Sequence, residues 1–284
     1  MSAYEVLGLW WVLPAGVALS GYALSLAGLT RAQRAVWVSA RVVRVGRLAH
    51  GASKRSGLPV AITFRDPSTR REFVLPNTGR HGDVVHEAWV GREFEVRYPP
   101  GHPHRFRIVL DTAGEKHGRI GSNCAVALLL VGSVVHAAVV RGYPWALLGF
   151  GALFAAFAAA SPDIRQARAR DALMASAVAV PARVVAVTMD VHTDGEGEEF
   201  VSHAPVVRFT TREGTEVTVL SLDGIPDPGP SLDRALTVHY APTDPAVWTA
   251  DPAADRRGNA QAVGTIVTLL AVGAAAVATG LVLL

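Results

Sequence analysis

The feature that most constrains the fold is a repeat whose period is half the chain. The motif ARVV at Ala40–Val43 recurs at Ala182–Val185, 142 residues later. The longer motif VRYPPGHP at Val96–Pro103 recurs as VHYAPTDP at Val238–Pro245, with the same shift, in a chain of 284 residues. Self-similarity at a fixed spacing indicates a duplicated structural unit. We therefore expect two copies of one unit, arranged head to tail.

Long stretches without a charged residue bracket both copies. Half of the residues are apolar and only 18% are charged, whereas soluble domains carry about 25%. A helix needs roughly 20 apolar residues to cross the hydrocarbon of a membrane. The sequence thus predicts transmembrane helices at 6–29, 120–140, 143–161 and 262–284. A cleaved signal peptide is a weaker interpretation of the first stretch, because residues 1–5 contain no basic residue.

The distribution of basic residues predicts the orientation. Arginines and lysines gather beside the spans on the side of the two long intervening segments, whereas the loop between the second and third spans holds only Arg141. Positive residues favour the cytoplasmic side. We expect a multi-pass protein of the cell (inner) membrane, with both intervening segments in the cytoplasm and both termini outside. The single cysteine, Cys124, excludes a disulfide within one chain.

The intervening segments, residues 30–119 and 162–260, each have the size of one small domain. Apolar residues alternate along short stretches, as at 60–64, and such alternation indicates half-buried strands. We expect a membrane protein with four α-helical spans and two small antiparallel β-barrel or sandwich domains. Residues 161–173 should prolong the third helix. The strands predicted are 36–45, 59–64, 72–75, 93–98 and 106–110 in the first segment, and 178–189, 205–210, 216–221, 236–240 and 247–250 in the second.

The order of motifs ARVV, PVVRF and VHYAPTDP between membrane helices resembles the bacterial domain-of-unknown-function family 3592. The resemblance covers both segments and is clearer in the second, where Tyr240, Pro242, Asp244 and Pro245 match the closing strand and its proline-rich turn. His102 occupies the position of Asp244 in the first segment, where the sequence departs from the family pattern. The resemblance implies a membrane-tethered β-domain and no established activity.

Two groups of residues could carry metal chemistry. Imidazole suits zinc and similar ions, and the first segment has four loop histidines that the second lacks: His81, His86, His102 and His104. The second segment contains an acidic stretch like the start of a calcium loop, but an EF-hand needs an oxygen ligand and a glutamate where this chain has His192 and Val201. Solvated loops explain both groups better, so we expect no metal and no cofactor. The acidic stretch comprises Asp190, His192, Asp194, Glu196 and Glu198.

Motifs of catalysis are missing from the sequence. It contains no Gly-x-Ser-x-Gly turn and no glycine-rich loop followed by Lys-Ser/Thr. His136 lies within the second span, where an ionisable residue is a functional candidate, but its place near the span's end favours an interfacial position. We expect no enzyme and no nucleic-acid partner. Small residues that allow close helix packing recur four apart at Gly16/Ser20, Gly21/Ser25 and Ala276/Gly280.

The two segments carry opposite net charge. Residues 30–119 hold 17 basic and 8 acidic residues, a net of +9, and residues 162–260 hold 9 and 15, a net of −6. The loop 50–57 contains Lys54 and Arg55, whereas its counterpart 190–199 contains five carboxylates. Opposite fields favour intramolecular docking of the segments. Independent drift, or attraction of the first segment to anionic lipid, stays open as an explanation.

Together these features predict a non-enzymatic scaffold or interaction module that presents two cytoplasmic β-domains. Its expected partners are the lipid bilayer and a protein or a second copy of the chain. The alternative is a small transporter or channel component gated by the β-domains. A metal-dependent enzyme would rest on the four loop histidines alone.

Overall fold

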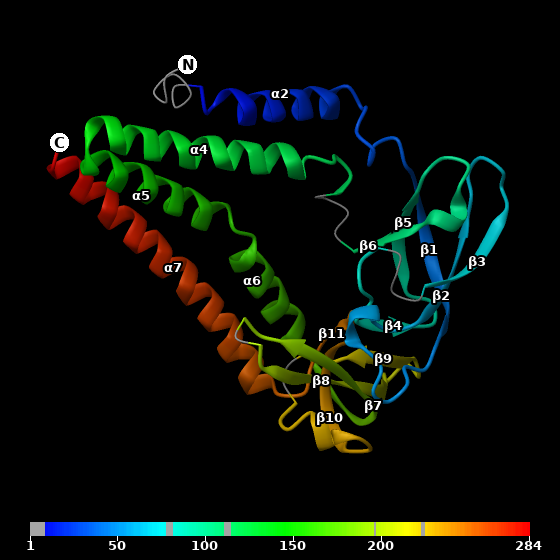
Figure 1. The fold of residues 1–284 in the computed structure, drawn as a ribbon. Helices are drawn as coiled ribbons and strands as arrows, with labels where there is room; N and C mark the ends of the chain where they lie inside the picture. The colour runs from blue at the N-terminus through cyan, green and yellow to red at the C-terminus, as the bar shows by residue number, and fades with distance from the viewer. Residues whose placement is uncertain (1–8, 78–81, 111–114, 196, 223–224) are drawn as a thin grey trace. The chain divides into compact units, whose positions relative to one another are not determined.

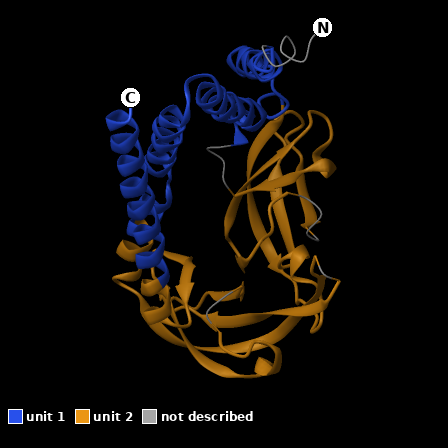
Figure 2. Ribbon diagram, turned by 60° about the vertical axis from the view of Figure 1, so that its left-hand side comes forward, with its two compact units in different colours: residues 1–34, 113–168, 258–284 blue, residues 35–112, 169–257 orange. Residues whose placement is uncertain are grey.

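The chain divides into a helical unit and a β-rich unit in the computed structural model, which describes residues 9–77, 82–110, 115–195, 197–222 and 225–284 (Figures 1 and 2). The helical unit is assembled from three separate stretches of chain, and the β-rich unit from the two stretches between them. The chain therefore passes from one unit to the other at four points. The helical unit is 1–34, 113–168 and 258–284, and the β-rich unit is 35–112 and 169–257.

Three helical stretches among the described residues are long and apolar enough to cross a membrane. They are α4 (Ile120–Arg141), the stretch Tyr143–Met174, and α7 (Pro252–Val282). The first predicted span contains α2 (Val12–Leu26), an apolar helix of 15 residues. Residues 6–8 of that span lie outside the described residues. The helices thus fit a membrane protein, and a fourth span stays a prediction.

The prediction that 161–173 continues the third helix is wrong in detail. Helix α5 (Tyr143–Ala160) ends before Pro162, and a separate helix, α6 (Asp163–Met174), follows. Ser161 has the extended value of ψ, 131°, because a residue before proline is pushed out of the helical region. Helix α7 also begins ten residues before its predicted span, since Asp251 accepts hydrogen bonds from two backbone N–H groups of its first turn.

Glycines allow close contact between helices of the helical unit. A Cβ atom on Gly21 of α2 would lie 2.1 Å from Ser122 Oγ in α4, and one on Gly151 of α5 would lie 2.8 Å from the carbonyl oxygen of Gly273 in α7. A Cβ atom on Gly280 would lie 2.9 Å from the carbonyl oxygen of Pro144. Gly21 and Gly280 therefore pack closely, as their spacing predicts, whereas Gly16 has no neighbour within 4 Å of such an atom.

The first segment forms a five-stranded antiparallel sheet in the order β3-β2-β1-β5-β6. All five strands coincide with predicted strands to within two residues at either end. Alternate residues of its strands point to one face and are buried and apolar, such as Val42, Val96 and Ile62, which have 0% exposure. Short 3-10 helices lie at Lys54–Ser56 and Pro103–Arg105. The strands are β1 (Val36–Val45), β2 (Val60–Arg65), β3 (Glu72–Asn77), β5 (Glu93–Tyr98) and β6 (Arg107–Val109).

The second segment forms most of a six-stranded antiparallel sheet in the order β11-β10-β7-β8-β9-β4. Its β7–β8 hairpin is longer than predicted, because the pairing continues to Thr193 opposite Glu199. The strands are β7 (Val178–Thr193), β8 (Glu199–Thr210), β9 (Glu216–Leu220), β10 (Ala235–Ala241) and β11 (Asp244–Thr249), with a 3-10 helix at Gly229–Ser231. Both segments thus give antiparallel sheets with open strand orders, and closed barrels stay a prediction.

The two sheets share their internal geometry. Val36 pairs with Tyr98 in the first sheet, and Val178 pairs with Tyr240 in the second, which shifts both partners by 142 residues. The register also shifts at the same point of each central strand, between Val42 and Arg44 and between Val184 and Ala186. The ARVV motif therefore marks a β-bulge, which inserts one unpaired residue and bends the strand.

A short strand of the first segment completes the sheet of the second. Strand β4 (Glu87–Trp89), which the sequence pattern did not predict, pairs antiparallel with β9, so that Ala88 lies opposite Thr218. The apolar core of the first sheet also contains buried residues of the second segment. The two segments are therefore packed together within one β-rich unit. Those core residues are Ala186, Ala204, Val206 and Leu220.

A buried tyrosine on the closing strand fixes a turn in the first sheet. Tyr98, 1% exposed, donates a hydrogen bond of 2.8 Å to Asp66 Oδ1 in the turn after β2. Asp66 also accepts hydrogen bonds from the hydroxyls of Thr69 and Ser68. These bonds, that from Thr69 above all, lower the pKa of Asp66 well below its usual range. Burial and the adjoining carboxylate raise the pKa of Tyr98.

Tyr240 has the same position in the second sheet but different partners. Its hydroxyl accepts a hydrogen bond of 2.9 Å from the backbone N–H of Arg212 and lies 3.4 Å from Glu213 Oε2. Asp244 opens β11 directly after a tight turn, and its Oδ1 accepts a hydrogen bond from a backbone N–H two residues on. His102 instead lies in a longer connection that contains a 3-10 helix, so the two residues have different structural positions.

Candidate binding site between the two β-rich segments

The structure describes three of the four loop histidines, His86, His102 and His104. His102 and His104 are exposed, and His104 contacts the edge of Phe73. His86 lies next to β4, where its carbonyl oxygen accepts a hydrogen bond from Leu220 N–H. His81 lies outside the described residues. Among the residues described, no three His, Cys, Asp or Glu side chains are grouped so that they could hold a metal ion.

Asp190, predicted to lie in an exposed acidic loop, is buried at the contact between the segments, with 7% exposure. Its carboxylate accepts a hydrogen bond of 2.5 Å from the Ser53 hydroxyl and one of 2.8 Å from the backbone N–H of Lys54. These bonds, that from Ser53 first, lower the pKa of Asp190. Asp190 therefore binds the first segment, while Asp194 closes the hairpin by accepting a hydrogen bond from Glu198 N–H. Glu196 lies outside the described residues.

The basic loop of the first segment lies against this hairpin. Lys54 Nζ donates a hydrogen bond of 2.6 Å to Ser202 Oγ, and an Arg55 guanidinium nitrogen lies 3.4 Å from His192 Nδ1. Backbone bonds from Gly51 N–H to Val187 and from Met189 N–H to Ala52 join the same elements. The contact thus combines strand-like pairing with polar side chains, and the contribution of the opposite net charges stays a prediction.

Polar side chains also pair within the helical unit. The Tyr22 hydroxyl of α2 donates a hydrogen bond of 2.7 Å to Asn123 Oδ1 of α4. Near the same ends of these helices, Arg119 Nε donates to Ser25 Oγ over 2.8 Å. His136, the ionisable candidate of α4, is exposed in the chain.

A cavity of about 420 Å³ lies where β4 and β9 approach the start of α7. Both segments line it, the first with His86 and Glu87 and the second with Trp248 and Leu222 among others. Its volume lies within the range of small-molecule sites. The cavity exists because β4 crosses to the second sheet, so only the assembled β-rich unit can form it.

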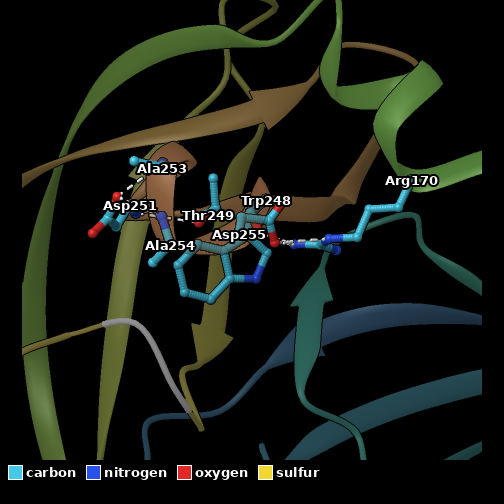
Figure 3. Close-up of polar contacts among 7 residues, drawn as sticks. All are labelled: Arg170, Trp248, Thr249, Asp251, Ala253, Ala254 and Asp255. Atoms are coloured by element: carbon cyan, nitrogen blue, oxygen red, sulfur yellow. Dashed lines mark hydrogen bonds and ion pairs between the residues drawn. The ribbon is translucent and has the colours of Figure 1, made fainter. Parts of the chain in front are cut away.

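Arg170 and two aspartates organise one wall of this cavity (Figure 3). Arg170 of α6 donates to Asp255 Oδ1 over 2.9 Å and to the carbonyl oxygen of Trp248 over 2.8 Å, so it ties α6 to the start of α7. Asp251 accepts hydrogen bonds from the backbone N–H groups of Ala254 and Ala253, and the bond from Ala254 above all lowers its pKa. These charged groups are therefore satisfied by the fold itself.

His86 is a polar side chain of the cavity with free capacity for a ligand. Its Nδ1 is buried and has no hydrogen-bond partner among the described residues. Glu87, which lines the same cavity, forms an ion pair of 3.3 Å with Arg92. An unsatisfied imidazole beside Trp248 can bind a polar group of a ligand whose apolar part packs on the indole. This arrangement suits binding, since the neighbouring carboxylates are held in structural bonds.

A second cavity of about 310 Å³ is also lined by both segments. Arg47 comes from the first segment, and Arg183, Arg208, Thr218 and Asp233 come from the second. No sequence motif marks this site, because its residues are 10 to 186 positions apart. The register of β7, β8 and β9 brings Arg183, Arg208 and Thr218 together. Asp233 precedes β10 and joins them because its backbone N–H donates a hydrogen bond to the carbonyl oxygen of Val184 in β7.

No protein-family model matches the chain. No curated protein and no solved structure is significantly similar to it. The resemblance to domain-of-unknown-function family 3592 therefore receives no support from these comparisons, and the function rests on the geometry.

Proposed function

We propose that the chain is a non-enzymatic scaffold or interaction module of the cell (inner) membrane, with both β-rich segments in the cytoplasm and both termini outside. The apolar helices support an anchor in a bilayer, and the asymmetry of basic residues supports the orientation. The shared strand order and register support an origin of the two segments by duplication. In this proposal the duplicated segments act as one binding body.

The observation that carries this proposal is the 420 Å³ cavity lined by both segments. A cavity that needs β4 from one segment and β9 from the other is a property of the pair. Its unsatisfied His86 Nδ1 and its Trp248 offer a ligand one polar and one apolar contact. The bound species is a small ligand or a side chain of a partner protein.

Site-specific photo-crosslinking tests the proposal. A photoreactive residue at Leu222, which lines the cavity and is 52% exposed, should form a discrete adduct in cells that express the chain. The matched control is Val74, 61% exposed on β3 and not part of the cavity wall. Equal labelling at both positions, or no adduct at Leu222, contradicts a binding role for the cavity.

The Tyr22–Asn123 pair favours a second candidate, a small transporter or channel component gated by the β-rich unit. Polar pairs between membrane helices line solute paths in many transporters. If the helices conduct, Asn123→Ala should change solute flux across vesicles that contain the protein. Ser133→Ala is the control, because that hydroxyl bonds only within its own helix, to Leu129. Unchanged flux in both variants removes this candidate.

A further inference from the structure

Two arginines face each other across the second sheet. Arg183 of β7 pairs directly with Arg208 of β8, and Arg208 pairs in turn with Thr218 of β9. Side chains of directly paired residues project from the same face of a sheet, and like charges in such pairs are destabilising. The sheet therefore places two like-charged side chains opposite each other, an arrangement that costs stability. Both arginines line the 310 Å³ cavity that Arg47 of the first segment also lines.

The neighbouring carboxylates satisfy these arginines only in part. Asp233 lies 3.3 Å from Arg183 Nε, but both side chains are well exposed, 65% and 70%, so water screens the pair. Glu216 lies 3.6 Å from Arg208 Nε, beyond hydrogen-bond distance. Arg208 Nε is buried and has no hydrogen-bond partner among the described residues. Within the cavity wall, three arginines stand against one carboxylate, Asp233.

We propose that this cavity binds a phosphate-bearing anion between the two β-rich segments. A phosphoryl group accepts paired hydrogen bonds from guanidinium forks. Bound here, it would neutralise the opposed Arg183–Arg208 pair and accept a bond from the buried Arg208 Nε. Arg47 would close the site from the first segment. The inference names a ligand class for the proposed binding body and rests on that function. The phosphoryl group belongs to a free anion or to a lipid headgroup.

The first sheet provides an internal comparison. At the equivalent place Arg41 of β1 pairs with Thr63 of β2, which pairs with Val74 of β3. The row thus contains one arginine in place of two, and Arg41 forms a short ion pair of 2.8 Å with Glu93. This row has no surplus of positive charge. At this position the arginine pair is therefore present in the second sheet and absent from the first, and Arg41→Gln is the matched control. The first sheet pairs Arg97 with Arg107 on β5 and β6, but neither of these arginines lines the cavity.

The test uses the full chain in nanodiscs of phosphatidylcholine, with two probes measured by calorimetry. One probe is inorganic phosphate and the other is short-chain phosphatidic acid. At least one should bind, and Arg208→Gln or Arg47→Gln should weaken that binding about tenfold or more, whereas Arg41→Gln should change it less than twofold. Binding of phosphate alone assigns a free anion, and binding of phosphatidic acid alone assigns a lipid headgroup. Absence of binding by both probes overturns the proposal.

Thermal unfolding separates a binding role from a structural one. Without a probe, Arg208→Gln should unfold at the same or a higher temperature than the native chain, because it removes like-charge repulsion. The probe that binds should raise the unfolding temperature of the native chain and of Arg41→Gln, but not that of Arg208→Gln. Equal stabilisation of all three chains refutes the site. If the site is refuted in this way but the adduct at Leu222 is still formed, the proposed function stands. If phosphate binds but no adduct forms at Leu222, the assignment of the 420 Å³ cavity is wrong and the arginine site stands.

Discussion

Asp190 offers the sharpest test of how the two β-rich segments are held together. Its buried carboxylate receives hydrogen bonds from Ser53 Oγ and Lys54 N–H, both in the loop of the first segment. Asp190→Ala removes both acceptors without adding volume. The loop should then open more often, and the backbone N–H of Lys54 should exchange with solvent more rapidly.

The magnitude follows from the two bonds. A hydrogen bond to a charged group contributes about 1.5–3 kcal/mol. Asp190→Ala removes the bond from Lys54 N–H in full, whereas the Ser53 hydroxyl can bind water instead. We therefore expect the free energy of opening the loop to fall by about 2 kcal/mol. This corresponds to roughly 30-fold faster exchange at Lys54. Asp190→Asn keeps an acceptor but loses the charge, so its cost should be about 1 kcal/mol, or roughly fivefold.

Hydrogen–deuterium exchange of the peptide that covers residues 50–57 measures this change. Asp194→Ala is the control, because that side chain closes the hairpin through Glu198 N–H and should leave the exchange of Lys54 unaffected. The critical result is that exchange is fastest in Asp190→Ala, slower in Asp190→Asn and slowest in the native chain. Equal exchange in all three chains would falsify the view that Asp190 holds the first segment.

The remaining predictions concern topology, stability, metal content and charge. In a Cys124→Ser background, cysteines at the exposed positions Ser68 and Thr243 should resist a membrane-impermeant thiol reagent in intact cells, and one at Tyr143 should react. Labelling at position 68 before the cells are lysed would contradict the predicted orientation. Tyr98→Phe should lower the free energy of unfolding by about 1–2 kcal/mol, because it removes a buried donor to Asp66. Folding lowers the pKa of Asp66, so its ionised carboxylate stabilises the folded state. This contribution to the free energy of unfolding should be complete above the ordinary pKa of 3.8 and be lost as the pH falls through the lower pKa of the folded state. Denaturation at several pH values measures the loss. Elemental analysis should find no stoichiometric zinc or calcium, and one bound ion lost in the double variant His102→Ala/His104→Ala would contradict this. Exchange in residues 50–57 should rise between 0.1 and 1 M salt, because the Debye length falls from about 10 to about 3 Å; no change would mean that the opposite net charges contribute little.

Local patterns were sufficient for most strands. Strand β1 and strand β5 begin and end where apolar alternation predicts, because their inward residues fill a core while their outward residues meet solvent. The short β4 carries no such signal. Its three residues form a strand only because β9, far along the chain, presents an open edge to them. Long-range pairing of this kind leaves no periodic trace in the sequence.

The sites were harder to predict than the strands for the same reason. Asp190 and its neighbours have the composition of an exposed acidic turn, and the partner that buries Asp190 is Ser53, 137 residues away. Arg183 and Arg208 are unremarkable alone, and their opposition depends on a bulge in β7 that sets the register. The charge difference between the segments predicts that they meet, but it does not identify the atoms in contact.

The strand that β4 lends to the second sheet has a consequence for synthesis of the chain. Ala88 and its partner Thr218 are 130 residues apart, and two apolar helices, α4 and α5, are translated between them. At roughly 5–20 residues per second, the synthesis of these 130 residues leaves β4 without its partner strand for about 6 to 26 seconds. An unpaired edge can bind wrong strands, so the interval between the two segments is the stage of biogenesis at which this protein is most exposed to aggregation.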